Sequence, residues 1–127
     1  MCLCWLCALN FKRLYWNPVS HVSALASCTQ LETLQLDGTQ VSDLSELAFC
    51  TQLQTLKLHW TQVSDVSALA SCTRLQTLDL TCSPVSDVRA LASCTQLHKL
   101  NLNSCRQVSD VSALASCTQL QTLKLHW

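Results

Sequence analysis

The chain has 127 residues, which suits one small domain, and its 8 basic and 8 acidic side chains give a formal net charge of zero. A nucleic-acid-binding surface requires clustered lysines and arginines, so this balance argues against a nucleic-acid partner. Hydrophobic residues make up 49% of the chain, yet no apolar run reaches the length of a membrane span. Because Gly38 is the only glycine, we expect few turns with positive φ angles.

The N-terminal nine residues are apolar and contain three cysteines in a C-x-C-x-x-C pattern. No basic residue precedes this run, and Lys12 and Arg13 follow it, which reverses the charge order of a secretory signal peptide. We therefore interpret residues 1–8 as the degenerate tail of a preceding repeat and expect a cytoplasmic protein. The three cysteines lack a nearby fourth ligand, so no zinc site is predicted there.

A 22-residue unit, L-x-x-L-x-L-x-x-T-x-V-S-D-V-S-A-L-A-S-C-T-Q, recurs along the chain. The repeat domain is predicted to span residues 9–127, with units at 9–30, 31–52, 53–74, 75–96 and 97–119 and a partial unit at 120–127. The unit 97–119 carries one extra residue. Lys12 stands where the other units have leucine at the fourth position, as expected of a weakened terminal repeat.

Seven positions of each unit are apolar, and in the best-formed unit they are Leu53, Leu56, Leu58, Val63, Val66, Leu69 and Cys72. The L-x-L spacing places Leu56 and Leu58 on one face of a short strand, with Lys57 and His59 on the other. The V-x-x-V-x-x-L-x-x-C pattern has a period of three, which predicts a 3-10 or irregular return instead of an α-helix. A single coil cannot bury these side chains, so we expect coils to stack.

In these motifs the chain resembles the leucine-rich repeat family, in its short 22-residue class found in internalins and in a protein-phosphatase regulatory subunit. The segment V-S-D-V-S-A-L-A-S-C-T is also similar to leucine-rich repeat arrays of kinetoplastid protozoa. The resemblance implies a right-handed α/β solenoid, with short parallel strands on the concave face and 3-10 or irregular returns on the convex face. The family usually has asparagine at the ninth position, which here holds Asn17, Thr39, Thr61, Ser83 and Cys105.

Five cysteines share one apolar repeat position: Cys28, Cys50, Cys72, Cys94 and Cys117. Side chains stacked in parallel do not converge as a disulfide requires, so we predict a buried ladder of mostly reduced thiols. Cys82 and Cys105 are expected in turns after the strands, with exposed side chains.

An aspartate follows V-S in four units, at Asp43, Asp65, Asp87 and Asp110. We expect each to accept hydrogen bonds from free backbone N–H groups at the start of the return. An acidic row that binds a cation is the alternative.

No motif of catalytic or cofactor chemistry is present. The four histidines lack H-x-x-x-H spacing, and G-x-S-x-G and phosphate-binding glycine loops are absent. We therefore predict no enzyme, no catalytic residues, no cofactor and no metal.

The outward strand positions differ between units, whereas the apolar positions hardly change. This contrast predicts a repeated scaffold with an individual, exposed binding face that includes Gln35. Basic, aromatic and amide side chains are typical binding anchors. The candidate protein-binding residues are Arg13, Tyr15, Trp16, Lys57, His59, Trp60, Lys99, Asn101, Lys124, His126 and Trp127. Alternatively, Trp60 and Trp127 are duplicated copies that only cover neighbouring turns.

Together these patterns predict a non-catalytic protein–protein interaction scaffold that uses the concave strand face, with a protein partner and neither a nucleic acid nor a membrane partner. The resemblance suggests one alternative, a regulatory subunit of an enzyme such as a protein phosphatase. A fragment of a longer repeat protein without independent function is another. The strand around Leu123 has no following coil, so we expect self-association at this uncapped C-terminal end.

Overall fold

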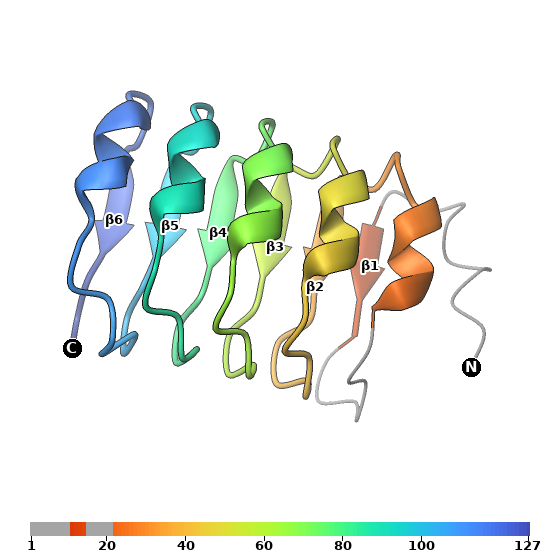
Figure 1. Cartoon of the computed structure of the whole chain (residues 1–127), viewed down its shortest axis with the longest axis horizontal. Coiled ribbons are helices and arrows are strands. Elements are labelled where there is room, and N and C mark those ends of the chain that lie inside the picture. The colour runs from red at the N-terminus through yellow and green to blue at the C-terminus, as the bar shows by residue number, and fades with distance from the viewer. Residues whose placement is uncertain (1–10, 15–21) are drawn as a thin grey trace.

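The structure is a computed structural model that describes residues 11–14 and 22–127. Short strands alternate with 3-10 helices along the chain (Figure 1). The strands are β1 (Phe11–Arg13), β2 (Thr33–Gln35), β3 (Thr55–Lys57), β4 (Thr77–Asp79), β5 (Lys99–Asn101) and β6 (Thr122–Lys124). The 3-10 helices are η2 (Ser23–Ser27), η3 (Ser45–Phe49), η4 (Ser67–Ser71), η5 (Arg89–Ser93) and η6 (Ser112–Ser116).

All six strands form one parallel sheet in chain order. Each strand pairs with the equivalent residues of the next coil, so that the central leucines align in a column: Leu34, Leu56, Leu78, Leu100 and Leu123. The 3-10 helices line up on the opposite side of the solenoid from the strands (Figure 1). The predicted fold class, a leucine-rich-repeat solenoid with strands on one face and 3-10 returns on the other, is confirmed.

The repeated apolar positions form the core. All seven in the unit 53–74 are at most 1% exposed. Each buried leucine or valine contributes about 1.5–3 kcal/mol before its ordering entropy is subtracted. The column is less protected at its end, where Leu123 is 39% exposed and Leu100 is 1% exposed. Stacking of neighbouring coils therefore buries the core, as the period predicts.

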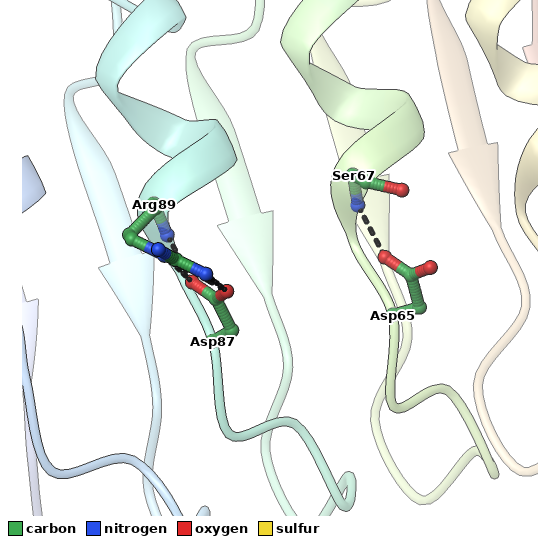
Figure 2. A network of polar contacts seen from close by, with 4 residues as sticks. All are labelled: Asp65, Ser67, Asp87 and Arg89. Atoms are coloured by element: carbon green, nitrogen blue, oxygen red, sulfur yellow. Dashed lines mark hydrogen bonds and ion pairs between the residues drawn. The ribbon is translucent and has the colours of Figure 1, made fainter.

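The recurring aspartates cap the 3-10 helices, as predicted (Figure 2). Asp65 Oδ1 accepts a hydrogen bond of 2.8 Å from the backbone N–H of Ser67, the first residue of η4. Asp87 Oδ1 accepts in the same way from the backbone N–H of Arg89, at 2.9 Å, and Asp87 Oδ2 pairs with the Arg89 guanidinium at 2.6 Å. Asp43 and Asp110 cap η3 and η6 in the same way. The hydrogen bond from the Arg89 side chain lowers the pKa of Asp87 to about 2.

The ninth position of the repeat points into the core. The Thr61 and Ser83 hydroxyls both donate to the Leu58 carbonyl oxygen, each at 2.9 Å. Cys105 occupies this position in its unit, and its Sγ lies 2.9 Å from the Leu80 carbonyl oxygen. Cys105 is fully buried, so the expectation of an exposed turn cysteine is wrong for this residue. Its repeat position, and not the neighbouring turn, decides where the side chain points. Cys82, one position earlier in its unit, is half-buried.

The cysteine ladder is present in the core, where Cys50, Cys72, Cys94 and Cys117 are buried and not disulfide-bonded. The Cys72 thiol donates to the Leu47 carbonyl oxygen, with 3.4 Å between the two atoms. Burial raises the pKa of Cys72 to about 12 and that of Cys94 to about 11. Cys28 is buried as well but is disulfide-bonded, so it departs from the predicted reduced state.

The turns after strands β2 to β5 contradict one expectation from composition. Besides Gly38, with a φ angle of 70°, three non-glycine residues have positive φ angles: Trp60 (59°), Cys82 (59°) and Ser104 (60°). Inter-coil hydrogen bonds explain this conformation, because it directs each backbone N–H to the next coil. The Trp60 N–H donates to the Thr81 carbonyl at 2.9 Å, and the Cys82 N–H donates to the Asn103 carbonyl at 3.0 Å. The scarcity of glycine therefore does not prevent this turn.

The extra residue of the unit 97–119 leaves the sheet in register. Lys124 pairs with Asn101, 23 residues earlier, whereas Asn101 pairs with Asp79, 22 residues earlier. The additional length is taken up by a second turn at residues 106–107. The insertion therefore changes a loop and leaves the strand face continuous.

Candidate functional site

The outward side chains of the strands form two columns on the strand face, which we define as the side of the sheet turned away from the core. The first column contains Thr33, Thr55, Thr77, Lys99 and Thr122. The second contains Gln35, Lys57, Asp79, Asn101 and Lys124. Adjacent members of a column lie one strand spacing apart, about 4.8 Å. The 22-residue period thus holds chemically different side chains at fixed intervals.

A hollow of about 290 Å³ lies on the strand face over β3 to β6. We call it the strand-face hollow, and its lining residues are Lys57, Thr77, Leu78, Asp79, Lys99, Leu100, Asn101, Thr122 and Lys124. Four of the predicted binding residues meet in this hollow: Lys57, Lys99, Asn101 and Lys124. The candidate binding residues predicted from the sequence did not include Thr77, Asp79 and Thr122, although their outward repeat positions place them on the strand face.

The charges of the strand-face hollow are unbalanced. Asp79 is the one carboxylate in the lining of the hollow. Asp79 Oδ1 accepts hydrogen bonds from the backbone N–H of Thr81 at 2.9 Å and from the Thr81 hydroxyl at 2.6 Å. Asp79 Oδ2 accepts from Asn101 Nδ2 at 3.4 Å. Within the described part of the chain, none of the three lining lysines forms an ion pair. Three ammonium groups therefore face one carboxylate that is already hydrogen-bonded.

The aromatic residues lie beside the strand-face hollow and do not line it. The His59 and Trp60 rings stack with centroids 6.1 Å apart, and Trp60 is 57% exposed. The backbone N–H of His59 donates to Asp37 Oδ1 at 3.0 Å, while burial raises the pKa of Asp37. Trp127 is 60% exposed in the last coil. The aromatic side chains are thus presented at the turns that follow the strands.

Other predicted residues are separate from the strand-face hollow. Arg13 lies on β1, at the other end of the sheet, and is exposed. His126 is exposed, and its backbone N–H donates to Asn103 Oδ1. Tyr15 and Trp16, like Asn17 and the N-terminal cysteines, lie outside the described residues.

One strand-face position differs from the prediction. Gln35 is only 9% exposed, although it belongs to the second outward column. Arg13 and Lys57 flank it in register on the two neighbouring strands. An outward position is therefore not always an exposed one.

Within residues 11–14 and 22–127, no group of three or more histidine, cysteine, aspartate or glutamate side chains is placed to hold a metal ion. In the same part of the chain, no helix has the length and apolar character required to span a membrane.

Known proteins share both the repeat and the fold. A family model for leucine-rich repeats in two copies matches residues 73–116. An internalin from Listeria monocytogenes has a TM-score of 0.89 and 31% sequence identity over 91% of this chain. Internalin C2 from the same organism has a TM-score of 0.81 and 34% identity over 97% of this chain. The chain belongs to the leucine-rich repeat family. It is of the short type, and it spans 34% of the first internalin and 54% of the second.

More distant leucine-rich repeat proteins share the fold. The ectodomain of a plant membrane receptor kinase from Arabidopsis thaliana, in complex with Casparian strip integrity factor 2, has a TM-score of 0.79 and 23% identity. The match covers 98% of this chain and 16% of the receptor chain. No curated protein matches the chain in sequence.

Proposed function

We propose that this leucine-rich repeat chain is a non-catalytic protein-binding module that holds its partner on the strand face over β3 to β6. The strand-face hollow is the observation that carries the proposal. Its lining includes the repeated leucines Leu78 and Leu100, which are each only 1% exposed, whereas its polar side chains differ from coil to coil. Such a surface has the same backbone shape in each coil but different side chains from one coil to the next, as a recognition surface requires.

Rigidity supports the same proposal. Every strand residue that lines the hollow is held by parallel pairing. The backbone ladder continues beyond the strands, because the Leu58 N–H donates to the Asp79 carbonyl at 2.8 Å and the Leu80 N–H to the Asn101 carbonyl at 2.9 Å. A fixed backbone lowers the entropic cost of binding. The receptor ectodomain that shares this fold is likewise seen in complex with a named factor.

A selection from a displayed random-peptide library tests the proposal, followed by affinity measurements on two variants. Thr77→Trp fills the strand-face hollow, and the matched control Ser64→Trp places the same bulk on the opposite side, beside the caps of the 3-10 helices. We expect Thr77→Trp to weaken binding of the selected peptides at least about tenfold, and Ser64→Trp to leave it unchanged. The reverse pattern would make the helix side the recognition surface and would refute the proposal.

The aromatic pair beside the hollow is proposed as a second anchor for a larger partner. Trp60 is exposed and stacked on His59, so it is presented in one orientation. For a partner that reaches this turn, Trp60→Ala should lose about 2 kcal/mol of binding free energy. Asp65→Ala, on the helix side, should leave the affinity unchanged. Circular dichroism of both variants must first show a folded chain, since Asp65 caps η4.

We also infer that the face beyond β6 pairs with a second copy of this chain. Leu123 and Trp127 are 39% and 60% exposed, although Leu100, which is equivalent to Leu123, is 1% exposed. The formal charge of zero offers little repulsion between copies. Sedimentation should show concentration-dependent dimers, and Leu123→Lys should abolish them. A wild-type chain that remains monomeric at high concentration would contradict this inference.

A further inference from the structure

We propose that the segment bound in the strand-face hollow is an extended acidic peptide stretch, whose aspartate or glutamate carboxylates meet Lys57, Lys99 and Lys124. This inference rests on the proposed function and deepens it, because it names the chemistry of the partner. The inference rests on where the charges lie in the hollow and not on the overall charge, because the chain as a whole has a formal net charge of zero.

The lining of the strand-face hollow is positive. The lysines that line it contribute three charges, and Asp79 contributes the opposite charge. Asp79 is already hydrogen-bonded to Thr81 and Asn101, and the lysines form no ion pair within the described part of the chain. A concave surface lined by one sign of charge concentrates the field inside it and attracts the opposite charge. Anionic side chains are therefore favoured there.

The spacing of the lysines fits an extended chain that crosses the strands. Lys57 and Lys124 lie in the same column on β3 and β6, three strand spacings apart, which is about 14 Å. An extended peptide advances about 3.3 Å per residue, so about four residues span this distance. Carboxylates four positions apart can thus meet both lysines. Lys99 lies between them, on β5 in the other column, and can meet a third carboxylate.

Neutral polar groups of the hollow complete the fit. The Thr77 and Thr122 hydroxyls and the Asn101 side-chain amide line the same surface, and each can both donate and accept hydrogen bonds. These groups can satisfy the peptide backbone between the charged side chains. The lining contains no aromatic ring, although stacking on aromatic rings is the usual way in which proteins hold single-stranded nucleic acid. The lining therefore favours an acidic peptide over an oligonucleotide.

Fluorescence anisotropy with a labelled heptapeptide of alternating glutamate and serine tests the inference at low salt, with a glutamine–serine heptapeptide as the uncharged control. The variant Lys57→Gln/Lys99→Gln/Lys124→Gln removes the three charges of the hollow. The matched variant Arg74→Gln/Arg89→Gln/Arg106→Gln removes three exposed charges that do not line the hollow. We expect the lysine variant to bind the glutamate peptide at least about tenfold more weakly than the wild-type chain, and the arginine variant to stay within about twofold of it.

Three results would overturn the inference: equal binding of the two heptapeptides, an equal loss in the arginine variant, or tighter binding of a seven-nucleotide oligothymidylate than of the glutamate peptide. The library selection separates this failure from failure of the proposed function. Selected peptides that Thr77→Trp displaces but that carry no excess of acidic residues would refute the acidic partner alone. Selected peptides that Thr77→Trp does not displace would refute both.

Discussion

Ser104 offers a direct test of the strain in the turns that follow strands β2 to β5. Its φ angle is 60°, its side chain is exposed, and its backbone N–H donates to the His126 carbonyl at 2.6 Å. Ser104→Gly keeps this backbone hydrogen bond and removes an exposed side chain, so packing changes little. We expect the variant to be more stable than the wild-type chain.

The expected gain is the difference between two opposing contributions. A non-glycine residue in the left-handed region costs roughly 1–2 kcal/mol relative to the ordinary right-handed conformation. Glycine removes this strain, but the greater freedom of the unfolded chain costs about 0.5–1 kcal/mol. The net gain is therefore about 0.5–1 kcal/mol. Ser109 is exposed and is not among the described residues with a positive φ angle. Ser109→Gly therefore has only the entropic cost and should destabilise the chain by about 0.5–1 kcal/mol.

Urea unfolding followed by circular dichroism measures both free energies, with Ser104→Ala as a further control that retains the strain. The expected order of stability is Ser104→Gly above wild type, Ser104→Ala close to wild type, and Ser109→Gly below it. Equal destabilisation by the two glycine variants would show that Ser104 carries no strain, and the reasoning would then be wrong.

Leu78→Ala should cost about 2–5 kcal/mol in urea unfolding, whereas Leu123→Ala should cost clearly less, because Leu78 is 1% exposed and Leu123 is 39% exposed. At about pH 8, a pKa of about 12 instead of 9.0 leaves Cys72 about a thousandfold less thiolate. Mass spectrometry should therefore find half-buried Cys82 alkylated in the folded chain and Cys72 only after unfolding; equal rates would contradict this. The pKa of Asp87 is lowered to about 2 from 3.8, so its stabilisation is complete above about pH 5 and is lost as the pH falls through about 2. Asp87→Asn should reduce this acid-dependent loss in urea unfolding.

The sequence predicts well what the repeat itself determines. The apolar positions recur in the full units, with Lys12 as the exception, so the burial of residues such as Leu56 and Cys72 follows from the period alone. The period of three in the return predicts the 3-10 helices, and the aspartate before four of the returns predicts a cap such as that of Asp65. In each case the same short sequence pattern recurs in several coils, and the stacking of these coils stabilises the structure that the pattern predicts.

Features that depend on neighbouring coils are harder to predict. Trp60 has a positive φ angle because its N–H must reach the Thr81 carbonyl of the next coil, a requirement that composition does not reveal. Gln35 is only 9% exposed although its repeat position points outward. The strand-face hollow combines side chains from four strands, so the pattern within one unit indicates its members and not their common concavity.

The position of the extra residue in the unit 97–119 shows how the scaffold preserves its strand face. A shift of one residue within a strand would exchange its inward and outward side chains, because their period is two. Leu123 would then turn outward, and the charged Lys124 would turn toward the core. The insertion instead lengthens the turn at residues 106–107, and Lys124 remains paired with Asn101 on the strand face. Because the turns absorb changes in length, the 22-residue period can maintain both the core and the spacing of the outward side chains.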